Sequence, residues 1–379
     1  MEDFDNIPMV DLKSQYLSIK DQIDQSVIST IESSQFIGGS QVESFKISLQ
    51  DYLKVKHVIP CANGTDALQI ALMALGLKPG DEVLVPAFTY VATAEVIGLL
   101  GLTPIMIDVD LENFNILIDG LENKITSRTK AIVPVHLFGQ GTEMEDLLKF
   151  AKKHNLFVVE DNAQALGADY FFKNGSSSKL GTIGDIGCTS FFPSKNLGCY
   201  GDGGALMTND DRLAEKIKMI ANHGQSKKYH HKIIGCNSRL DSIQAAVLNV
   251  KLKYLDKYNT NRKNAAAFYI KELDKISEIV TPITMTYSSH VFHQFTLKVK
   301  ENQRDHLKDY LQKKGIPSMI YYPIPLYRQE AFSGYVSKSF NLENTEVLCK
   351  EVLSLPMHSE LKSETQEKII FHIKEFFNA

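Results

Sequence analysis

The sequence predicts an α/β protein in which a large, mainly parallel sheet is followed by a smaller α+β unit. Up to about residue 210, short apolar runs alternate with helical stretches, which is typical of parallel sheets covered by helices on both faces. From Asp241 onward, a long helical stretch is followed by shorter mixed elements. The length of 379 residues fits two domains at about 150 residues each, with room for a third.

Six apolar runs in the first part have the length and composition of buried strands, and turn residues bound several of them. They are HVIPCA (57–62), EVLVPAF (82–88), PIMIDV (104–109), AIVPVHL (131–137), LFVVED (156–161) and IGCTSFF (186–192). Helical patterns lie between several of these strands, at 65–77, 92–101 and 143–154. We therefore expect repeated strand–helix–strand units and a sheet that is buried on both faces.

The second part begins with residues 241–273, which contain neither Gly nor Pro and predict a long helix. The elements expected after it are a strand at 290–299, a helix at 303–315, a strand at 316–322 and a terminal helix at 364–377.

The expected domains are a large α/β domain over residues 1–250 and a small C-terminal α+β domain over residues 251–379. The long helix is expected to bridge them, and the N-terminal segment to be free to pack on the small domain.

Composition and charge argue against several classes of protein. A net charge of −4 without a basic block makes nucleic acid a poor partner. The five cysteines are odd in number and form no CxxC pair, which argues against a disulfide framework and a zinc site. His223 and the pair His230-His231 have no carboxylate or cysteine cluster around them, so no metal is expected. The first ten residues have no signal-peptide pattern and no apolar run is long enough to span a membrane, so we expect a cytoplasmic protein.

Ligands in open α/β sheets bind beyond the carboxyl ends of the strands, so polar residues at those ends are candidates for a site. The first strand leads through Asn63-Gly64-Thr65 directly into a helix. Gly64 allows close backbone approach, Thr65 could cap the helix, and the positive helix end suits a phosphate. The alternative is a capped helix without a ligand.

Two further strand ends carry candidate groups. Tyr90 follows the second strand, where its ring could lie on a flat ligand or simply pack against other residues. Glu160 and Asp161 end the fifth strand and face opposite ways, because side chains alternate along a strand. We expect one of them to point into the cleft, where a buried carboxylate needs a cation or hydrogen bonds. For Asp161, the alternative is a helix cap.

Lys195 stands alone after the sixth strand, between Thr189-Ser190 and the glycine-rich segment GCYGDGG (198–204). Loss of hydration lowers the pKa of an amine, and the neutral amine is the form that makes an imine with an aldehyde. A solvated loop lysine is the ordinary alternative. The flanking apolar residues and glycines favour close approach of another group instead.

Together these residues meet the requirements of pyridoxal phosphate, which needs a phosphate cup, a ring platform, an anion at the pyridine nitrogen and an imine-forming lysine. Thr65 and Ser190 suit the cup, Tyr90 the platform, Asp161 the anion and Lys195 the imine. All of them lie at predicted strand ends of one sheet.

Over nearly its whole length, from 9 to 358, the chain resembles the DegT/DnrJ/EryC1/StrS family of sugar-nucleotide aminotransferases. The motifs that carry the resemblance are NGTDAL, VPAFTYVATAE, PVHLFGQ, VVEDNAQALGA, SFFPSKNLGCYGDGGALMTND and GCNSRLDSIQAA. The resemblance implies the type I fold of aspartate aminotransferase, with a mostly parallel seven-stranded sheet. It also implies pyridoxal 5'-phosphate as cofactor and pyridoxamine 5'-phosphate as its form between the two half-reactions.

The resemblance implies a role for each matching residue. Lys195 is the Schiff-base lysine that also moves protons, and Asp161 is the partner of the pyridinium nitrogen. Gln164 lies near the ring hydroxyl, and Tyr90 stacks on the ring. The phosphate cup consists of Gly64, Thr65, Asp66 (through its backbone), Ser190 and, from a neighbouring subunit, Asn237. A homodimer with a shared active site follows from this arrangement.

Within the family, residues 223–241 and YYPIPL (321–326) look most similar to enzymes that aminate C-3 of UDP-2-acetamido-2-deoxy-3-oxo-glucuronate for surface-polysaccharide amino sugars. Glutamate is the implied amino donor, and Arg239 would lie near its carboxylate or that of the sugar. Tyr321 and Tyr322 are implied to contact substrate, although Tyr321 stands where the subgroup tends to have histidine.

The alternatives include a C-4 keto-sugar aminotransferase and a TDP-3-keto-6-deoxyhexose 3-aminotransferase. A keto-sugar dehydratase of this fold has histidine in place of the lysine, so Lys195 argues against it. A non-enzymatic regulator that binds the cofactor is the remaining alternative.

Overall fold

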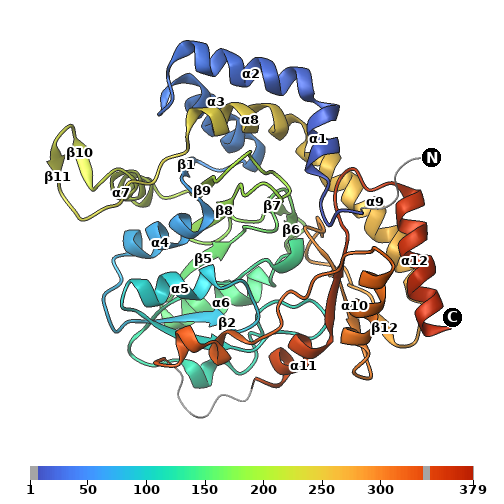
Figure 1. Cartoon of the computed structure of the whole chain (residues 1–379). Coiled ribbons are helices and arrows are strands. Elements are labelled where there is room, and N and C mark those ends of the chain that lie inside the picture. Colours follow the sequence, from blue (N-terminus) through green and yellow to red (C-terminus); the bar gives the residue numbers. More distant parts are fainter. Residues whose placement is uncertain (1–6, 336–341, 379) are drawn as a thin grey trace.

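The computed structural model describes residues 7–335 and 342–378. At its centre lies a seven-stranded sheet in the order β1-β9-β8-β5-β4-β2-β3 (Figure 1). The strands are β1 His57–Cys61, β2 Glu82–Pro86, β3 Thr103–Ile107, β4 Thr129–Ile132, β5 Phe157–Asp161, β8 Ile186–Ser190 and β9 Gly204–Thr208. Six of these strands are parallel, and β9 runs antiparallel to both of its neighbours. The predicted α/β class with a mostly parallel seven-stranded sheet is confirmed.

Strand β9 is the one strand of this sheet that the apolar pattern missed. It begins at the last glycine of the segment 198–204, which was expected to be a loop. No turn separates that segment from the strand. Its first residue, Gly204, lies opposite Cys61 of β1 and Ser190 of β8. This register brings the carboxyl ends of β1 and β8 to the same place.

Helices cover both faces of the sheet, as expected for parallel strands. Helices α4 (Gly64–Leu75), α5 (Ala92–Leu99) and α7 (Asp211–Ala221) share one apolar cluster with alternate strand residues such as Val83 and Val85. On the opposite face, Leu84 packs with helix α6 (Met144–His154). Successive side chains of β2 therefore point to opposite faces of the sheet and pack in two separate cores.

Three N-terminal helices, which the sequence analysis did not predict, lie beside helix α8 (Ser242–Lys251) (Figure 1). They are α1 (Leu12–Ser18), α2 (Lys20–Ser33) and α3 (Gly39–Leu53). Just before and within α2, Ile19 and Ile23 pack with Val247 and Val250 of α8. On α3, Phe45, Leu49 and Leu53 belong to the same buried cluster as Leu248.

The predicted helix over 241–273 is present with one local interruption. Helix α8 continues through a 3₁₀ turn, Leu252–Tyr254, into helix α9 (Leu255–Leu273). The two later predicted helices are also confirmed, as α10 (Arg304–Lys313) and α12 (Ser363–Phe377). A further helix, α11 (Glu343–Glu351), was not predicted.

The predicted strand at 316–322 is wrong, and that at 290–299 is shorter than expected. In the small sheet, β13 (Phe295–Val299) pairs with β12 (Ile279–Val280) and β14 (Val352–Leu355). Residues 316–322 make only an isolated bridge, between Met319 and Ser354. Pro317 and Pro323 flank that bridge, and proline lacks the N–H group that a longer ladder requires.

The C-terminal elements enclose a core of their own, which includes Tyr269, Phe295 and Leu307. Ile7, from the start of the chain, is buried in this core, and Met9 accepts a hydrogen bond from the Met357 N–H. The division into domains at residue 250 stays a prediction. Within the described residues, no helix is long and apolar enough to cross a membrane.

Two small hairpins lie outside the two larger sheets. One consists of β6 (Asp169–Phe171) and β7 (Ser177–Lys179). The other consists of β10 (Gln225–Lys227) and β11 (His230–His231) and projects away from the body of the molecule (Figure 1).

We expect Gly204→Ala to destabilise the protein by about 2 kcal/mol or more, because overpacking of a close contact has costs of this size. A Cβ atom at Gly204 would meet the backbone carbonyl of Asn63, which cannot move without disturbing the start of α4. Denaturant unfolding measures the change. Gly334→Ala is the control, since no atom of the described residues lies within 4 Å of its Cβ position. Equal stability of the two variants would contradict the prediction.

Candidate active site

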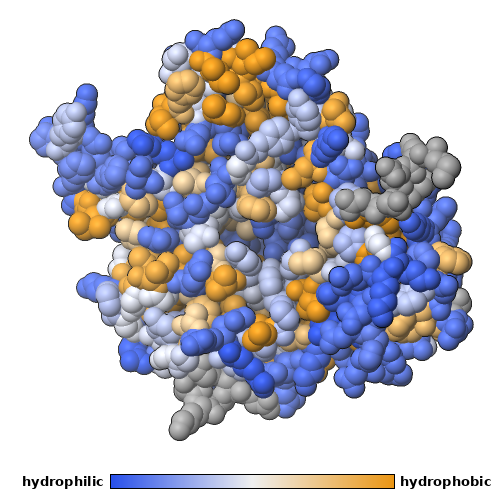
Figure 2. Space-filling model, viewed as in Figure 1, coloured by the Kyte–Doolittle hydropathy of each residue, from blue (hydrophilic) through white to orange (hydrophobic). Residues whose placement is uncertain are grey.

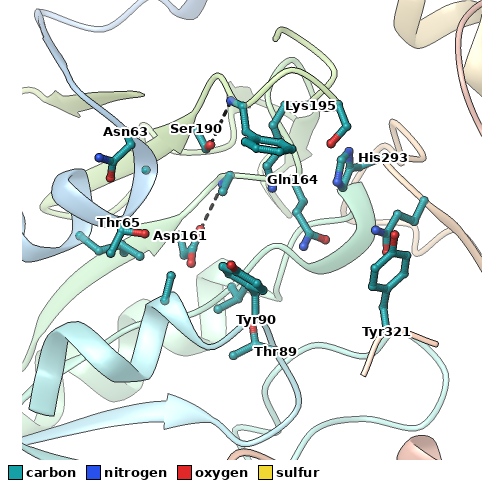
Figure 3. Close-up of a pocket in the computed structure, with 18 of the residues that line it drawn as sticks. Asn63, Thr65, Thr89, Tyr90, Asp161, Gln164, Ser190, Lys195, His293 and Tyr321 are labelled. Carbon is teal, nitrogen blue, oxygen red and sulfur yellow. Dashed lines mark hydrogen bonds between the residues drawn. The ribbon is translucent and has the colours of Figure 1, made fainter. Parts of the chain in front are cut away.

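A cavity of about 630 Å³ lies at the carboxyl ends of β1, β5 and β8 (Figure 3). Nine of the twelve predicted site residues line it. They are Gly64, Thr65, Tyr90, Asp161, Gln164, Ser190, Lys195, Tyr321 and Tyr322. The other three, Asp66, Asn237 and Arg239, do not. Residues from strand ends far apart in the sequence therefore meet at one place.

One end of the cavity is formed by the start of α4 and the end of β8. The helix begins at Gly64, and its cap is Asn63, whose Oδ1 accepts the Asp66 N–H at 2.8 Å. The expectation that Thr65 is the cap was therefore wrong, because Thr65 already lies inside the first turn. A Cβ atom on Gly64 would lie 2.7 Å from Ser190 Cβ, so only glycine allows this approach.

The first N–H groups of any α-helix have no partner within the helix, and the helix dipole places partial positive charge there. The side chains of Thr65 and Ser190 line the cavity beside this helix end. The predicted backbone contact from Asp66 is less direct, because its N–H is already bonded to Asn63. This end of the cavity has the donors that an anion requires.

Asp161 and Glu160 point in opposite directions from β5, and Asp161 is the one that faces the cavity. Thr93 donates its hydroxyl to Asp161 Oδ2 at 2.7 Å, and the Ala163 N–H donates to Oδ1 at 3.1 Å. The carboxylate caps no helix; its two hydrogen bonds fix its orientation toward the cavity.

Glu160 is fully buried on the other side of β5. It accepts hydrogen bonds from His136 Nε2 at 2.9 Å and from the N–H groups of Gly181, Ile183 and Gly184 at 2.6–2.8 Å. Burial alone would raise the pKa of the Glu160 carboxyl, but His136 and the backbone donors lower it below its ordinary value. Glu160 therefore joins β5 to the loop that leads into β8.

Lys195 extends into the cavity from the loop after β8 (Figure 3). Burial removes water from its ammonium group and lowers the pKa of Lys195 to about 8, although the nearby charge of Asp161 acts in the opposite direction. His293 lies beside it, and burial together with the positive charges of Lys195 and Arg262 holds the pKa of His293 well below its ordinary value. A substantial fraction of Lys195 is thus neutral near pH 8.

Aromatic and amide groups line another side of the cavity. Tyr90 is 57% exposed, and its ring centroid lies 6.3 Å from that of Tyr322. Gln164 accepts the Phe138 N–H at 2.7 Å and donates to the Tyr322 hydroxyl at 3.3 Å. Burial raises the pKa of Tyr321 and of Tyr322, so both phenols stay protonated over the physiological range.

Asn237 and Arg239 are exposed and lie in the segment that follows the β10–β11 hairpin. Asn237 forms an isolated bridge with Asn222. In the same region, His231 Nδ1 lies 2.8 Å from the carbonyl oxygen of His223. The part of the chain that the structure describes contains no group of three side chains able to hold a metal ion.

The residues of the site that were not predicted from the sequence include Asn63, Thr93, His293 and Gln294. The first two lie inside motifs that were singled out, NGTDAL and VPAFTYVATAE, so helix geometry could have found them. His293 and Gln294 lay in the strand expected at 290–299, where neighbouring side chains should point to opposite faces. That sequence pattern gave no signal for two consecutive cavity residues.

Residues 17–374 match the model of the DegT/DnrJ/EryC1/StrS aminotransferase family. The chain belongs to this family. Its fold is confirmed by a TM-score of 0.93 to the crystal structure of S. venezuelae DesV in complex with a ketimine intermediate. The two chains are 36% identical, and the match covers 99% of each.

Three curated relatives are similar over almost their whole length. A pleiotropic regulatory protein of Geobacillus stearothermophilus is 44% identical over 98% of this chain and 99% of its own. A UDP-N-acetyl-3-dehydro-alpha-D-glucosamine 3-aminotransferase of Acidithiobacillus ferrooxidans is 43% identical, over 96% of each chain. A UDP-2-acetamido-2-deoxy-3-oxo-D-glucuronate aminotransferase of Pseudomonas aeruginosa is 44% identical over 94% of this chain and 96% of its own.

The lowered pKa of Lys195 predicts how its reactivity depends on pH. In the cofactor-free protein, acylation of Lys195 followed by peptide mass spectrometry should rise with a midpoint near pH 8, because only the neutral amine reacts. Asp161→Asn should move the midpoint lower, since the carboxylate raises the pKa of Lys195. A midpoint near 10.5, the ordinary value of lysine, would contradict the prediction.

Glu160→Gln should destabilise the protein by about 3 kcal/mol at neutral pH, because it breaks a buried ionic hydrogen-bond cluster. The pKa of Glu160 is lowered by folding, so its contribution is present above about pH 4.5 and is lost as the pH falls below that value. Urea unfolding at pH 7 and pH 4 should therefore show a smaller difference from the wild type at pH 4. Glu367→Gln, at an exposed position, is the matched control.

Proposed function

We propose that this protein is a pyridoxal phosphate-dependent aminotransferase that acts on a keto-sugar nucleotide. The amino group would pass from glutamate to C-3 of a substrate such as UDP-2-acetamido-2-deoxy-3-oxo-glucuronate, for amino sugars of surface polysaccharides. The observation that carries the proposal is the meeting of Lys195 and Asp161 in one cavity with the glycine-dependent helix start at Gly64.

The residues of the cavity fit the cofactor. The start of α4, with Thr65 and Ser190, offers donors for its phosphate, and the Gly64–Ser190 approach leaves room that a Cβ would fill. Asp161 offers a carboxylate whose orientation is already fixed by Thr93 and Ala163. When bound, the cofactor supplies an electron sink for a carbanion at the carbon that carries the amino group.

This chain's own residues then bind, orient and move protons. Lys195, with its pKa lowered to about 8, can take and return a proton at its Nζ near neutral pH. Gln164 is held between the Phe138 N–H and the Tyr322 hydroxyl, and Tyr90 presents its exposed ring to the cavity. These positions agree with ring contacts for Gln164 and Tyr90 and with substrate contacts for Tyr321 and Tyr322.

A homodimer with a shared site is part of the proposal. Asn237 is exposed and does not line the cavity of its own chain, which supports the proposal that it reaches the site of a neighbouring subunit. Hydrophobic side chains gather over the N-terminal helices at the top of Figure 2. Exposed apolar residues of this region are Leu17, Ile28, Ile31, Phe36, Ile37 and Ile47. A patch of this kind is typical of subunit interfaces. Location in the cytoplasm stays a prediction.

The choice of C-3 and of the sugar rests on two relatives, of which one is named as a 3-aminotransferase of a 3-dehydro sugar and the other as an aminotransferase of a 3-oxo acetamido sugar. The residues proposed to hold the cofactor would suit amination at C-4 or a TDP-linked substrate equally well. A purely regulatory role is the second candidate, because one similar relative is named as a regulatory protein. The two candidates differ in whether glutamate would react with the cofactor that Lys195 holds.

We expect purified protein with pyridoxal phosphate to show a long-wavelength absorbance band that bleaches when glutamate is added. The band depends on a covalent link to Lys195, so Lys195→Ala should bind the cofactor without forming it. A second variant, Lys13→Ala, changes a lysine outside the cavity and should behave as the wild type.

A band that forms but does not respond to glutamate would overturn the proposed donor. A folded wild-type protein without any such band would contradict the enzyme and favour the regulator. A panel of keto-sugar nucleotides, added after glutamate, then identifies the acceptor by recovery of the band.

A further inference from the structure

A small alcove of about 70 Å³ adjoins the main cavity. The two spaces share four lining residues, Ser194, His293, Gln294 and Tyr321, and are therefore neighbours. The remaining walls are the side chains of Met9, Val10, Leu355 and Met357. A single water needs about 10–15 Å³ of such space, so the alcove can hold a group of several heavy atoms.

Two buried polar atoms on residues that line this alcove have no hydrogen-bond partner among the described residues. They are His293 Nδ1, on a side chain that is only 7% exposed, and Gln294 Oε1. An unpaired buried polar atom is costly, and such atoms are rare in folded proteins. Both residues also line the alcove, so imidazole and amide side chains form its polar wall.

The backbone is specifically arranged to present both side chains. Phe292, the preceding residue, has a φ of 43°, in the left-handed region that a phenylalanine rarely adopts. Gly139 packs so closely that a Cβ there would lie 3.0 Å from the backbone nitrogens of Phe292 and His293. The turn explains why two neighbouring residues face the same space.

Arg262 holds the two walls of the alcove together. Its buried Nη1 donates to the carbonyl oxygens of Phe292, His293 and Met357, each at 3.1 Å. His293 belongs to the polar wall and Met357 to the apolar wall. The guanidinium group thus fixes the shape of the alcove before a ligand enters.

The chemistry of the walls favours an uncharged group. None of the eight lining residues is acidic or a lysine or arginine, and burial with nearby cations keeps the His293 imidazole neutral. A carboxylate would find no free cation there. An acetamido group instead combines a methyl, which suits Met9, Val10, Leu355 and Met357, with an amide that can pair with His293 and Gln294.

The alcove also lies close to Lys195, where the substituents next to the reacting carbon of a sugar must lie. Ser194, at its mouth, directly precedes Lys195, and His293 lies beside that lysine (Figure 3). On a sugar that reacts at C-3, the substituent on C-2 is attached to the neighbouring carbon and must lie close to the lysine. We propose that the alcove at His293 and Gln294 binds the 2-acetamido group of the sugar nucleotide and selects it over a 2-hydroxyl group. This proposal rests on the proposed function.

Isothermal titration calorimetry of the protein loaded with pyridoxamine phosphate tests the proposal without turnover. The two probes are UDP-N-acetylglucosamine and UDP-glucose, which differ in this substituent. We expect the wild type to bind the acetamido sugar about tenfold more tightly, an effect of the size of one or two satisfied hydrogen bonds. Gln294→Leu should reduce that preference to about twofold and leave UDP-glucose binding nearly unchanged.

Val10→Phe narrows the alcove and should selectively weaken binding of the acetamido sugar. This second variant tests the proposal without a change at Gln294. Gln312→Leu makes the same chemical change at an exposed position and should change neither affinity. Equal affinity of the wild type for both probes, equal weakening of both by Gln294→Leu, or an unchanged preference in Val10→Phe would each overturn the proposal.

Failure of the proposed function has a different signature. In that case the absorbance band would not respond to glutamate, whatever the calorimetry gives. A normal glutamate response with no binding of either probe would overturn the acetamido proposal alone.

Discussion

The buried hydrogen bonds of Glu160 are the interaction on which the rest of the site depends. Through His136 they connect β5 to the loop after β4, and through Gly181, Ile183 and Gly184 to the segment that enters β8. Strand β5 ends at Asp161, and β8 leads to Ser190 and then Lys195. One carboxylate that faces away from the cavity therefore sets the separation of the acid and the amine that face into it.

The electrostatics of the cavity follow from this arrangement. Burial lowers the pKa of Lys195, but Asp161 limits the shift, so the amine titrates near pH 8 rather than becoming permanently neutral. Proton transfer in both directions requires an amine whose pKa is close to the ambient pH. An amine with a much higher pKa would be a poor acid, and one with a much lower pKa would be a poor base. His293 stays neutral beside the lysine and adds no competing charge.

The sequence was most informative about strand ends. Apolar runs located β1, β5 and β8, and the carboxyl-end rule then placed Thr65, Asp161 and Lys195 at one edge without any structure. Thr93, which donates to Asp161, lies in a motif that was singled out, but its role was overlooked. The sequence could not predict His293 and Gln294, because the left-handed Phe292 breaks the alternation on which strand patterns rely. The failed strand at 316–322 has a different cause, because Pro317 and Pro323 limit its pairing to one isolated bridge.

The two ends of the cavity are formed by different parts of the structure, and this affects how substrate specificity can change. The end near Gly64 and Ser190 consists of sheet and helix backbone in glycine-dependent contact, so most substitutions there disturb the fold. The end near His293 and Tyr321 consists of loop side chains with space beyond them. Substitutions at Met9, Val10 or Gln294 can alter the shape and hydrogen bonding of the alcove while the lysine and its carboxylate stay in place. A fold arranged in this way can keep one chemistry while its sugar substrate varies, because the residues that hold the reacting groups are not those that recognise the substituents.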